Sequence, residues 1–100
     1  MTRISQQRFE ELYALHIAAW DDQATEETPG QMILLQEHDL SFLDLSGRDL
    51  RSCHLLGCNL QMCNLSGSNI SYSELMFSDL RGADLSGVVD EGTDYTGCLR

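Results

Sequence analysis

Three cysteines and a histidine near the middle of the chain are the residues whose types and spacing come closest to a chemical site. Cys53, Cys58 and Cys63 recur at intervals of five, and His54 follows the first of them. Thiolates and imidazoles are the usual ligands of structural zinc. The interval, however, belongs to a repeat that continues where Ser, Ala or Thr takes the place of cysteine. We therefore expect the thiols, including that of Cys98, to fill the core, and we predict no metal site.

The other potentially catalytic groups are not arranged for a reaction. His16 and His38 have no catalytic partner suggested by the sequence, and the serines between residues 66 and 78 lack the histidine and aspartate of a hydrolase triad. The chain has no glycine-rich phosphate loop. Outward carboxylates on a stiff scaffold stay solvated and ordinary. We predict a protein that is not an enzyme, with no catalytic residues, no cofactor-binding residues and no cofactor.

Charge and composition narrow the function further. The 100 residues include 16 acidic and 6 basic side chains, a net charge of −10. Because phosphate contacts require basic residues, direct binding to nucleic acid or to an anionic membrane is not expected. No apolar run approaches the roughly 18 residues of a membrane span, and residues 1–8 contain no apolar signal region. We expect one cytoplasmic domain, since 42% hydrophobic residues suffice for a core.

A five-residue repeat must position these side chains. From residue 39 onwards a large apolar residue occupies every fifth position, with one interruption at Asp90. These central positions are Leu40, Leu45, Leu50, Leu55, Leu60, Leu65, Ile70, Leu75, Leu80, Leu85 and Tyr95. The residue before each centre is usually Asp or Asn, and the residue two before it is nearly always small. Seven of the eight glycines stand two positions after a centre.

A period of five fits neither a continuous helix nor a continuous strand. It predicts a short extended step followed by a corner, where glycine supplies the positive φ that a type II turn needs. One large and one small side chain per unit then point inwards and fill a narrow interior. His54, one residue out of phase with the small positions, is expected to face solvent.

The unit Ala-Asp-Leu-Ser-Gly at residues 83–87 matches the consensus of the pentapeptide repeat family, which the chain resembles over residues 39–98. The resemblance implies a mainly β fold, a right-handed quadrilateral β-helix with four units per coil. It also implies about three coils, a solenoid about 15 Å long. Two residues depart from the pattern: Arg48 occupies a small inward position and Asp90 a large one. Residues 88–92 are expected to bulge outwards or to mark fraying of the last coil.

The first 37 residues predict a helical cap on a β-helix formed by residues 38–100. Ser5 can cap a helix that runs to about Trp20, because its hydroxyl accepts a free backbone N–H. That helix has an apolar stripe of Phe9, Leu12, Tyr13, His16 and Trp20. A second helix can begin at Thr28–Pro29 and bury residues 32–35, although these also fit a short strand. The cap interpretation is preferred because the end of a solenoid exposes open strand edges that need covering. The alternative role for the first helix is partner recognition.

Outward carboxylates suggest a partner. The predicted acidic contacts are Asp39, Asp44, Asp49, Glu74, Asp79, Asp84 and Asp94. Several members of the family that the chain resembles are DNA mimics, so the resemblance implies an inhibitor that blocks a basic nucleic-acid-binding protein or complex. DNA gyrase is one such target, and a CRISPR effector blocked by a phage-encoded protein is another. The alternative is a scaffold module for protein–protein interaction. The resemblance also implies a homodimer through the C-terminal end of the solenoid.

Outward apolar residues suggest either a surface that binds a partner or a surface that another segment of the chain covers. Phe42 stacks over Met62 in the repeat register and Leu56 over Met76, while Tyr72 and Phe77 also fall at outward positions. Groups of exposed apolar residues often mark contact surfaces. Our preferred interpretation is that the N-terminal helix covers them. The alternative makes Tyr72, Met76 and Phe77 part of a partner-binding surface.

Overall fold

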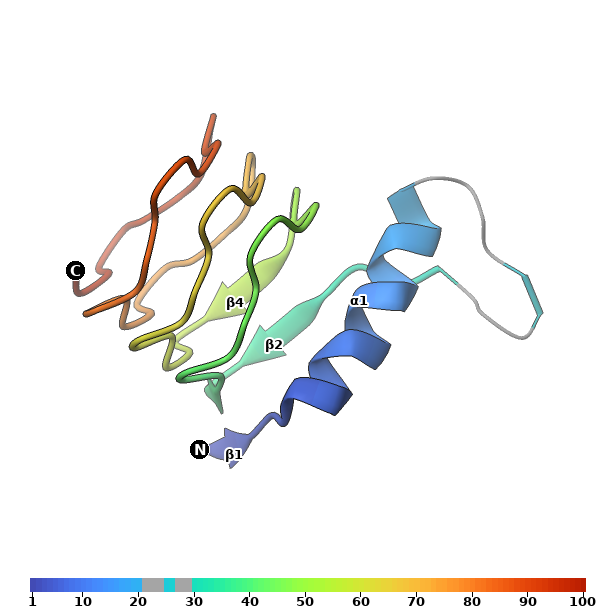
Figure 1. Cartoon of the computed structure of the whole chain (residues 1–100), viewed down its shortest axis with the longest axis horizontal. Coiled ribbons are helices and arrows are strands. Elements are labelled where there is room, and N and C mark those ends of the chain that lie inside the picture. The colour runs from blue at the N-terminus through green and yellow to red at the C-terminus, as the bar shows by residue number, and fades with distance from the viewer. Residues whose placement is uncertain (21–24, 27–29) are drawn as a thin grey trace.

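The repeat winds into a stack of coils that one helix and two short strands close at one end (Figure 1). The computed structural model describes residues 1–20, 25–26 and 30–100. In chain order the regular elements are β1 (Thr2–Arg3), α1 (Gln6–Trp20), β2 (Leu34–Gln36), β3 (His38–Asp39) and β4 (His54–Leu56). Strand β1 pairs in parallel with β3, and β2 with β4. Among these residues no helix is long and apolar enough to cross a membrane.

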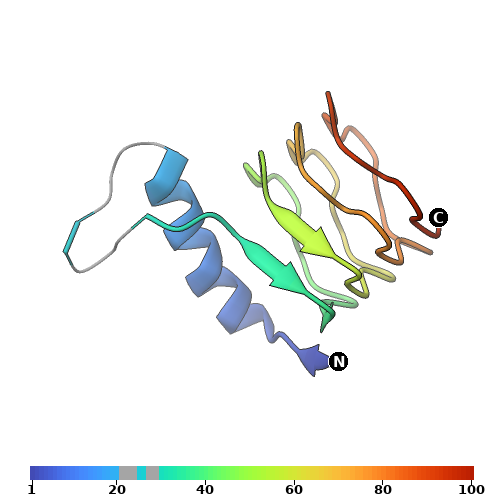
Figure 2. The same ribbon diagram turned by 180° about the vertical axis from the view of Figure 1, so that it is seen from behind.

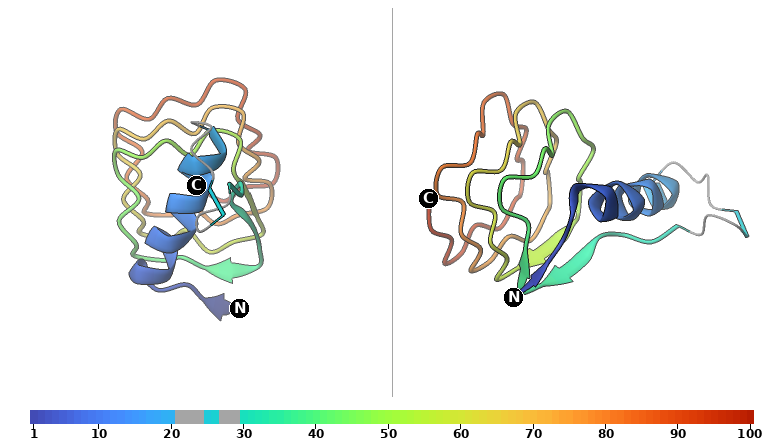
Figure 3. Two further views of the ribbon diagram at one scale, coloured as in Figure 1. Left: turned by 90° about the vertical axis from the view of Figure 1, so that its right-hand side faces the viewer. Right: turned by 60° about the horizontal axis from the view of Figure 1, so that its bottom comes forward.

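One turn of the coil takes twenty residues, or four units of the repeat. Parallel bridges connect residues twenty apart in the columns 39–59–79–99, 44–64–84, 49–69–89 and 54–74–94. Each column is one side of the coil, and Figure 3 shows the successive turns seen along the stack. The mainly β, β-helix-like fold that the sequence predicts is therefore confirmed.

The interior consists of the two inward positions of each unit. The central leucines from Leu40 to Leu80 are buried, and Leu40, Leu45 and Leu60 have no exposed surface. Small side chains between them donate hydrogen bonds to the carbonyl 23 residues earlier, as Cys63 Sγ does to Leu40 O at 2.7 Å. Ser73 Oγ makes the equivalent bond to the carbonyl of Leu50, also at 2.7 Å. A thiol and a hydroxyl donate the same hydrogen bond, which explains why either cysteine or serine occupies this position.

Every corner of the coil has a residue with positive φ two positions after the centre. Seven of these residues are glycines, as the sequence predicts. The other corners from residue 42 onwards are Phe42, Ser52, Met62, Tyr72 and Phe77, with φ between 59° and 66°. Since side chains with a Cβ are disfavoured in this region, these corners are strained relative to a glycine corner.

The expected irregularity at residues 88–92 is absent, and that prediction is wrong. Val89 pairs with Asn69 in the regular register, and the N–H of Tyr72 donates to the carbonyl of Glu91 at 2.8 Å. Asp90 is exposed and accepts a hydrogen bond from the Tyr95 hydroxyl at 2.7 Å. The Asp90 carboxylate lies in the last described turn and reaches solvent there, so it does not have to be buried in the core. The backbone hydrogen bonds between turns therefore keep the register of the repeat at this position.

Helix α1 begins where the sequence predicts. The Ser5 hydroxyl accepts a hydrogen bond from the N–H of Arg8 at 3.0 Å, an N-terminal cap. The helix ends at Trp20 and lies across the first turn of the coil, with Phe9, His16 and Ala18 buried. Thr28 and Pro29, the predicted start of a second helix, lie outside the described residues. Residues 34–36 form strand β2, so the strand alternative is confirmed and the helix alternative is wrong there.

The N-terminal segment covers all four sides of the first turn with different groups. Strand β1 covers the first side and β2 the fourth, and Figure 2 shows β2 beside β4. On the second side, the Gln6 amide donates a hydrogen bond to the carbonyl of Asp44 at 2.9 Å and accepts the N–H of Asp44 at 2.8 Å.

On the third side, two aromatic side chains of helix α1 make the hydrogen bonds. The Tyr13 hydroxyl accepts the N–H of Asp49 at 2.9 Å, and Trp20 Nε1 donates to the carbonyl of Arg51 at 2.9 Å. These bonds satisfy backbone groups that an open end would expose. The division of the chain between residues 37 and 38 stays a prediction.

Arg48 fits its small inward position because no coil lies beneath it. Its guanidinium lies 5.4 Å from the ring centroid of Phe9 and 5.0 Å from that of Tyr13, and it pairs with Glu10. It also donates to the carbonyls of Asp44 and Ser46 at 3.2 Å each. The residue that breaks the repeat in sequence therefore joins helix α1 to the solenoid.

The outward apolar residues are not covered by helix α1, and our preferred interpretation of them is wrong. The side chains of Phe42, Met62, Tyr72 and Phe77 stay between 54% and 72% exposed. The helix packs on the end of the stack rather than on a side, because its aromatic residues contact the first turn from beneath. The outward apolar positions are therefore open to a partner.

Candidate protein-interaction surface

The aspartates predicted as partner contacts make hydrogen bonds that shape the coil. Oδ1 of Asp44 accepts the backbone N–H of Ser46, two residues later, at 3.0 Å. Asn64, one turn later, accepts the same bond from Ser66 at 3.0 Å. Asp39, Asp49, Asp79, Asp84 and Asp94 make equivalent bonds. Because the turn needs only an acceptor oxygen, Asp and Asn are interchangeable at this position.

Arginines neutralise three of the seven predicted acidic contacts. The ion pairs are Arg3–Asp39 at 3.3 Å, Arg51–Asp49 at 2.6 Å and Arg81–Asp79 at 2.7 Å. The hydrogen bonds from Arg51 and Arg81 hold the pKa of Asp49 and Asp79 below its ordinary value. These carboxylates are charged, but each already has its cation.

The remaining four acidic contacts are divided between two sides of the coil. Asp44 and Asp84 lie on the second side, whereas Glu74 and Asp94 lie on the fourth. Hydrogen bonds from Ser46, Ser86 and Thr96 lower the pKa of Asp44, Asp84 and Asp94, which keeps these exposed groups ionised. Glu74 faces His54, with 3.4 Å between Oε2 and Nδ1. The acidic residues therefore do not form one continuous surface.

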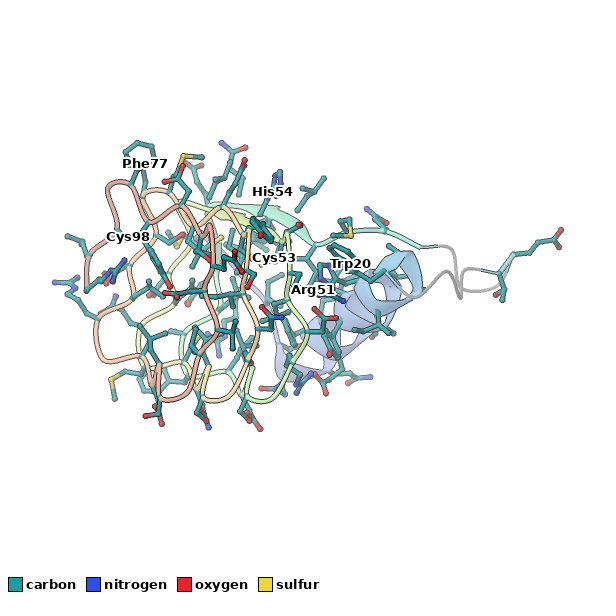
Figure 4. All side chains as sticks on the ribbon, turned by 90° about the horizontal axis from the view of Figure 1, so that it is seen from above. Trp20, Arg51, Cys53, His54, Phe77 and Cys98 are labelled. Carbon is teal, nitrogen blue, oxygen red and sulfur yellow. The ribbon has the colours of Figure 1, made fainter. Side chains whose placement is uncertain are left out.

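The fourth side of the coil brings together more of the predicted contacts than any other. This side, which we call the β2–β4 side, consists of residues 34–36, 54–56, 74–76 and 94–96 with its two corners. Glu74, Met76 and Asp94 lie on it, and Tyr72 and Phe77 stand at its corners. Figure 4 shows Phe77 pointing outwards at the edge of the coil. Apolar residues with acidic neighbours are typical of a surface that binds a basic, partly apolar protein segment.

Three hollows indent the β2–β4 side. The central hollow has a volume of about 410 Å³ and is lined by Gln36, Glu37, Leu56, Gly57, Met76 and Phe77. A hollow of about 680 Å³ lies on the side of Met1 and His38, and one of about 160 Å³ lies beside Leu34 and His54. Gln36 lines all three, and Glu37 lines the two larger ones. The hollows are thus parts of one indented surface.

Sequence reasoning missed Gln36 and Glu37 because it assigned residues 34–37 to the N-terminal segment. In the structure Leu34, Leu35 and Gln36 pair with residues 54, 55 and 56, in the same register of twenty. Glu37 has φ of 57°, the conformation of a corner. The signal was present, because Leu35 stands five residues before Leu40 and therefore in phase with the repeat.

The cysteines contribute no chemistry to this surface. Cys53, Cys58 and Cys63 are at most 1% exposed, which confirms that they belong to the core. Burial raises the pKa of Cys53 and Cys63 to about 11, so their thiols stay protonated and are poor nucleophiles and ligands. In the described part of the chain, no group of three or more His, Cys, Asp or Glu residues is placed to hold a metal ion.

Comparison with known proteins agrees with this geometry. The family described as pentapeptide repeats (8 copies) matches residues 35–71 and 49–87, which together span more than half of the chain. Among solved structures, the chain is similar to a pentapeptide repeat protein, Rfr23, from the cyanobacterium Cyanothece 51142. The two are 30% identical with a TM-score of 0.64, over 66% of this chain and 46% of that one. The chain thus spans less than half the length of Rfr23. No curated protein sequence matches the chain.

Proposed function

The chain belongs to the pentapeptide repeat family, and from this premise we propose that it is a non-enzymatic module that binds a partner protein through its exposed sides. The proposal takes the family's right-handed quadrilateral β-helix with about three coils as its scaffold. It places the protein in the cytoplasm and includes a homodimer through the C-terminal end of the solenoid. The β2–β4 side, with Tyr72, Glu74, Met76, Phe77 and Asp94, is the proposed contact surface.

The observation that carries the proposal is the occurrence of large, exposed apolar residues at strained corners. Tyr72 and Phe77 have φ of 60° and 63°, and their side chains are 57% and 70% exposed. Glycine occupies seven other corners at no steric cost. Side chains that stay in a disfavoured backbone region while contributing little to the core are typical of functional positions. A partner that covers them would bury apolar surface.

DNA mimicry is a second candidate function. It is favoured by Asp44, Asp84 and Asp94, which are exposed or half-exposed, have lowered pKa values and whose carboxylates form no ion pair with an arginine of the described residues. A basic nucleic-acid-binding protein, such as DNA gyrase or a CRISPR effector inhibited by a phage-encoded chain, would be the target. The arginines at Asp39, Asp49 and Asp79 weaken this candidate because they cancel half of the six aspartates that it needs.

Two matched sets of variants separate the candidates. Partners captured from a cell lysate are purified and their affinity is measured for the wild type, for Tyr72→Gly with Phe77→Gly, and for Asp44→Asn with Asp84→Asn and Asp94→Asn. We expect both sets to preserve the fold, because glycine and asparagine occupy the equivalent positions in other turns. If the protein is the proposed module, the glycine variants should weaken the affinity for the partner at least tenfold and the asparagine variants less than threefold. The reverse result, with competition by duplex DNA and a steep salt dependence, identifies a DNA mimic.

A further inference from the structure

Gly57 leaves a gap in the corner column 37–57–77–97 of the β2–β4 side. Glu37 precedes it by one turn and Phe77 follows it by one turn, and both have side chains at this corner. The Glu37 side chain lies beside Gly57, since a Cβ on residue 57 would be 3.6 Å from Glu37 Cγ. The central hollow of about 410 Å³ forms here, with Leu56 and Met76 as its apolar wall. One end of the hollow is therefore a carboxylate and the other an aromatic ring.

The chain itself shows what such a pair of groups binds. Arg48 lies over the rings of Phe9 and Tyr13 and pairs with Glu10. Arg51 lies 4.2 Å from the ring centroid of Trp20 and pairs with Asp49, and Figure 4 shows Trp20 and Arg51 next to each other between the coil and helix α1. A planar guanidinium suits this combination, because it stacks on an aromatic face while it hydrogen-bonds a carboxylate.

Among the residues that the structure describes, no cation completes this arrangement at Glu37 and Phe77. All six basic residues of the chain are arginines, and each is engaged elsewhere: Arg3 with Asp39, Arg8 with Glu11, Arg48 with Glu10, Arg51 with Asp49, Arg81 with Asp79 and Arg100 with the ring of Tyr95. Among the described residues no cationic group lies within 4 Å of the Glu37 carboxylate. A second copy of the chain, with a net charge of −10 and the same engaged arginines, is a poor source of the cation.

We infer that the central hollow accepts an arginine side chain of a partner protein, between the Phe77 ring and the Glu37 carboxylate. The aliphatic part of that side chain lies along Leu56 and Met76, and the guanidinium reaches Glu37. The inference rests on the proposed protein-binding function and specifies the residue of the partner that the β2–β4 side recognises. A lysine can reach the same carboxylate but lacks the planar group that stacks on Phe77.

The test uses three small peptides and the full chain. The probes are N-acetylated, C-amidated Ala-X-Ala tripeptides in which X is arginine, lysine or citrulline, the last being a neutral analogue of arginine with the same shape. Binding to the isotope-labelled chain is followed by amide chemical shifts in NMR. We expect the arginine probe to shift the amides of Gln36, Glu37, Leu56, Gly57, Met76 and Phe77. We expect the lysine probe to bind at least twofold more weakly and the citrulline probe at least fivefold more weakly.

Matched variants assign the effect to the hollow. Glu37→Gln and Phe77→Gly should each weaken the arginine probe at least threefold. Phe42→Gly is the control for the ring, because Phe42 has the same backbone conformation and exposure as Phe77 at another corner, and Glu91→Gln is the control for the carboxylate. Neither control should change the affinity. Equal binding of citrulline, shifts spread over all acidic residues, or equal effects of Phe42→Gly and Phe77→Gly would overturn the inference. A captured partner that needs Tyr72 but tolerates Phe77→Gly would overturn it while leaving the proposed function intact.

Discussion

The ring of Tyr72 fills the space beside Gly92, one coil turn later, so that a Cβ on residue 92 would come 2.6 Å from Cδ1 of the ring. Met62 stands in the same relation to Gly82, and Phe77 to Gly97. In these three pairs a large side chain at one corner is followed by a glycine at the same corner of the next turn. Such a glycine serves two purposes, since it adopts positive φ and also leaves room for its neighbour.

This relationship predicts that alanine is tolerated unequally at two glycine corners. Gly92 and Gly67 both have φ of 70°, but a Cβ on residue 67 would meet nothing within 4 Å. Gly67→Ala should cost about 1 kcal/mol of unfolding free energy, the backbone strain alone. Gly92→Ala should cost a further ~1 kcal/mol, because the new methyl group pushes the exposed Tyr72 ring away from its preferred rotamer. Urea unfolding of both variants measures the difference.

The double variant provides the control. In the Tyr72→Gly background the ring is absent, so Gly92→Ala should cost only about 1 kcal/mol of backbone strain relative to Tyr72→Gly alone. Equal losses for Gly67→Ala and Gly92→Ala would show that the ring moves aside without cost, and the corner relationship would then have no energetic consequence.

His16 makes the N-terminal segment sensitive to acid. Its Nδ1 accepts the N–H of Ile33 at 3.1 Å, its side chain has no exposed surface, and burial lowers its pKa below 6.5. The charge of Asp49 and a hydrogen bond with the Arg51 backbone oppose this lowering of the pKa, and the charge of the Arg51 guanidinium adds to it. In the unfolded chain His16 binds a proton as the pH falls through about 6.5, whereas in the folded chain it remains neutral at that pH. The unfolding free energy should therefore fall as the pH drops below 6.5, by up to about 1.4 kcal/mol per pH unit.

His16→Asn tests this prediction, because its amide oxygen can accept the Ile33 N–H but does not titrate. His38 and His54 are present in both proteins, so only His16 contributes to the difference between them. We expect the stability of the variant to change little between pH 7.5 and 5, where the wild type weakens. Parallel pH profiles would contradict the role of His16. The aspartates affect stability in a lower pH range. Because their pKa values are lowered in the folded chain, the stability that they contribute is lost only as the pH falls below about 4.

The four cysteines should differ sharply in reactivity. Cys98 is half-buried in the last described turn, whereas Cys53, Cys58 and Cys63 are at most 1% exposed. With an aromatic disulfide reagent at pH 8, one thiol per chain should react at least tenfold faster than the other three. Cys98→Ser should remove the fast phase and preserve the fold, since serine makes the equivalent hydrogen bond elsewhere. Two or more fast thiols would show that the coils open readily.

The repeat predicted the solenoid well because each unit repeats one physical solution. Leu55, Leu60, Leu65 and Leu75 are buried as expected, and the small positions contain cysteine and serine for the same reason. The period alone assigned the inward, outward and corner positions between residues 40 and 87. Each assignment was supported by many units, so a single exception such as Asp90 did not change the register.

The candidate surface was harder to predict, since it depends on which units become neighbours. The residues of the central hollow lie in three different turns, and Glu37 precedes the part of the chain where the repeat is obvious. The prediction treated all seven acidic residues alike, although arginines two residues after Asp49 and Asp79 neutralise them. It also placed helix α1 over a side of the coil, because amphipathic spacing identifies an apolar stripe but not the surface that it covers.

Arg48 gives the most direct test of how the N-terminal segment is attached. Its side chain is 16% exposed, and it joins Glu10 and two aromatic rings on α1 to the carbonyls of Asp44 and Ser46. Arg48→Met keeps the length but leaves both carbonyls without this donor, so we expect a loss of about 2 kcal/mol in unfolding free energy. Arg81→Met is the matched control, because Arg81 pairs with Asp79 on an open side and is 58% exposed. It should cost less than about 0.5 kcal/mol. Equal losses would mean that Arg48 contributes no more than a surface ion pair, and the aromatic stripe of α1 would then have to hold the helix on the coil by itself.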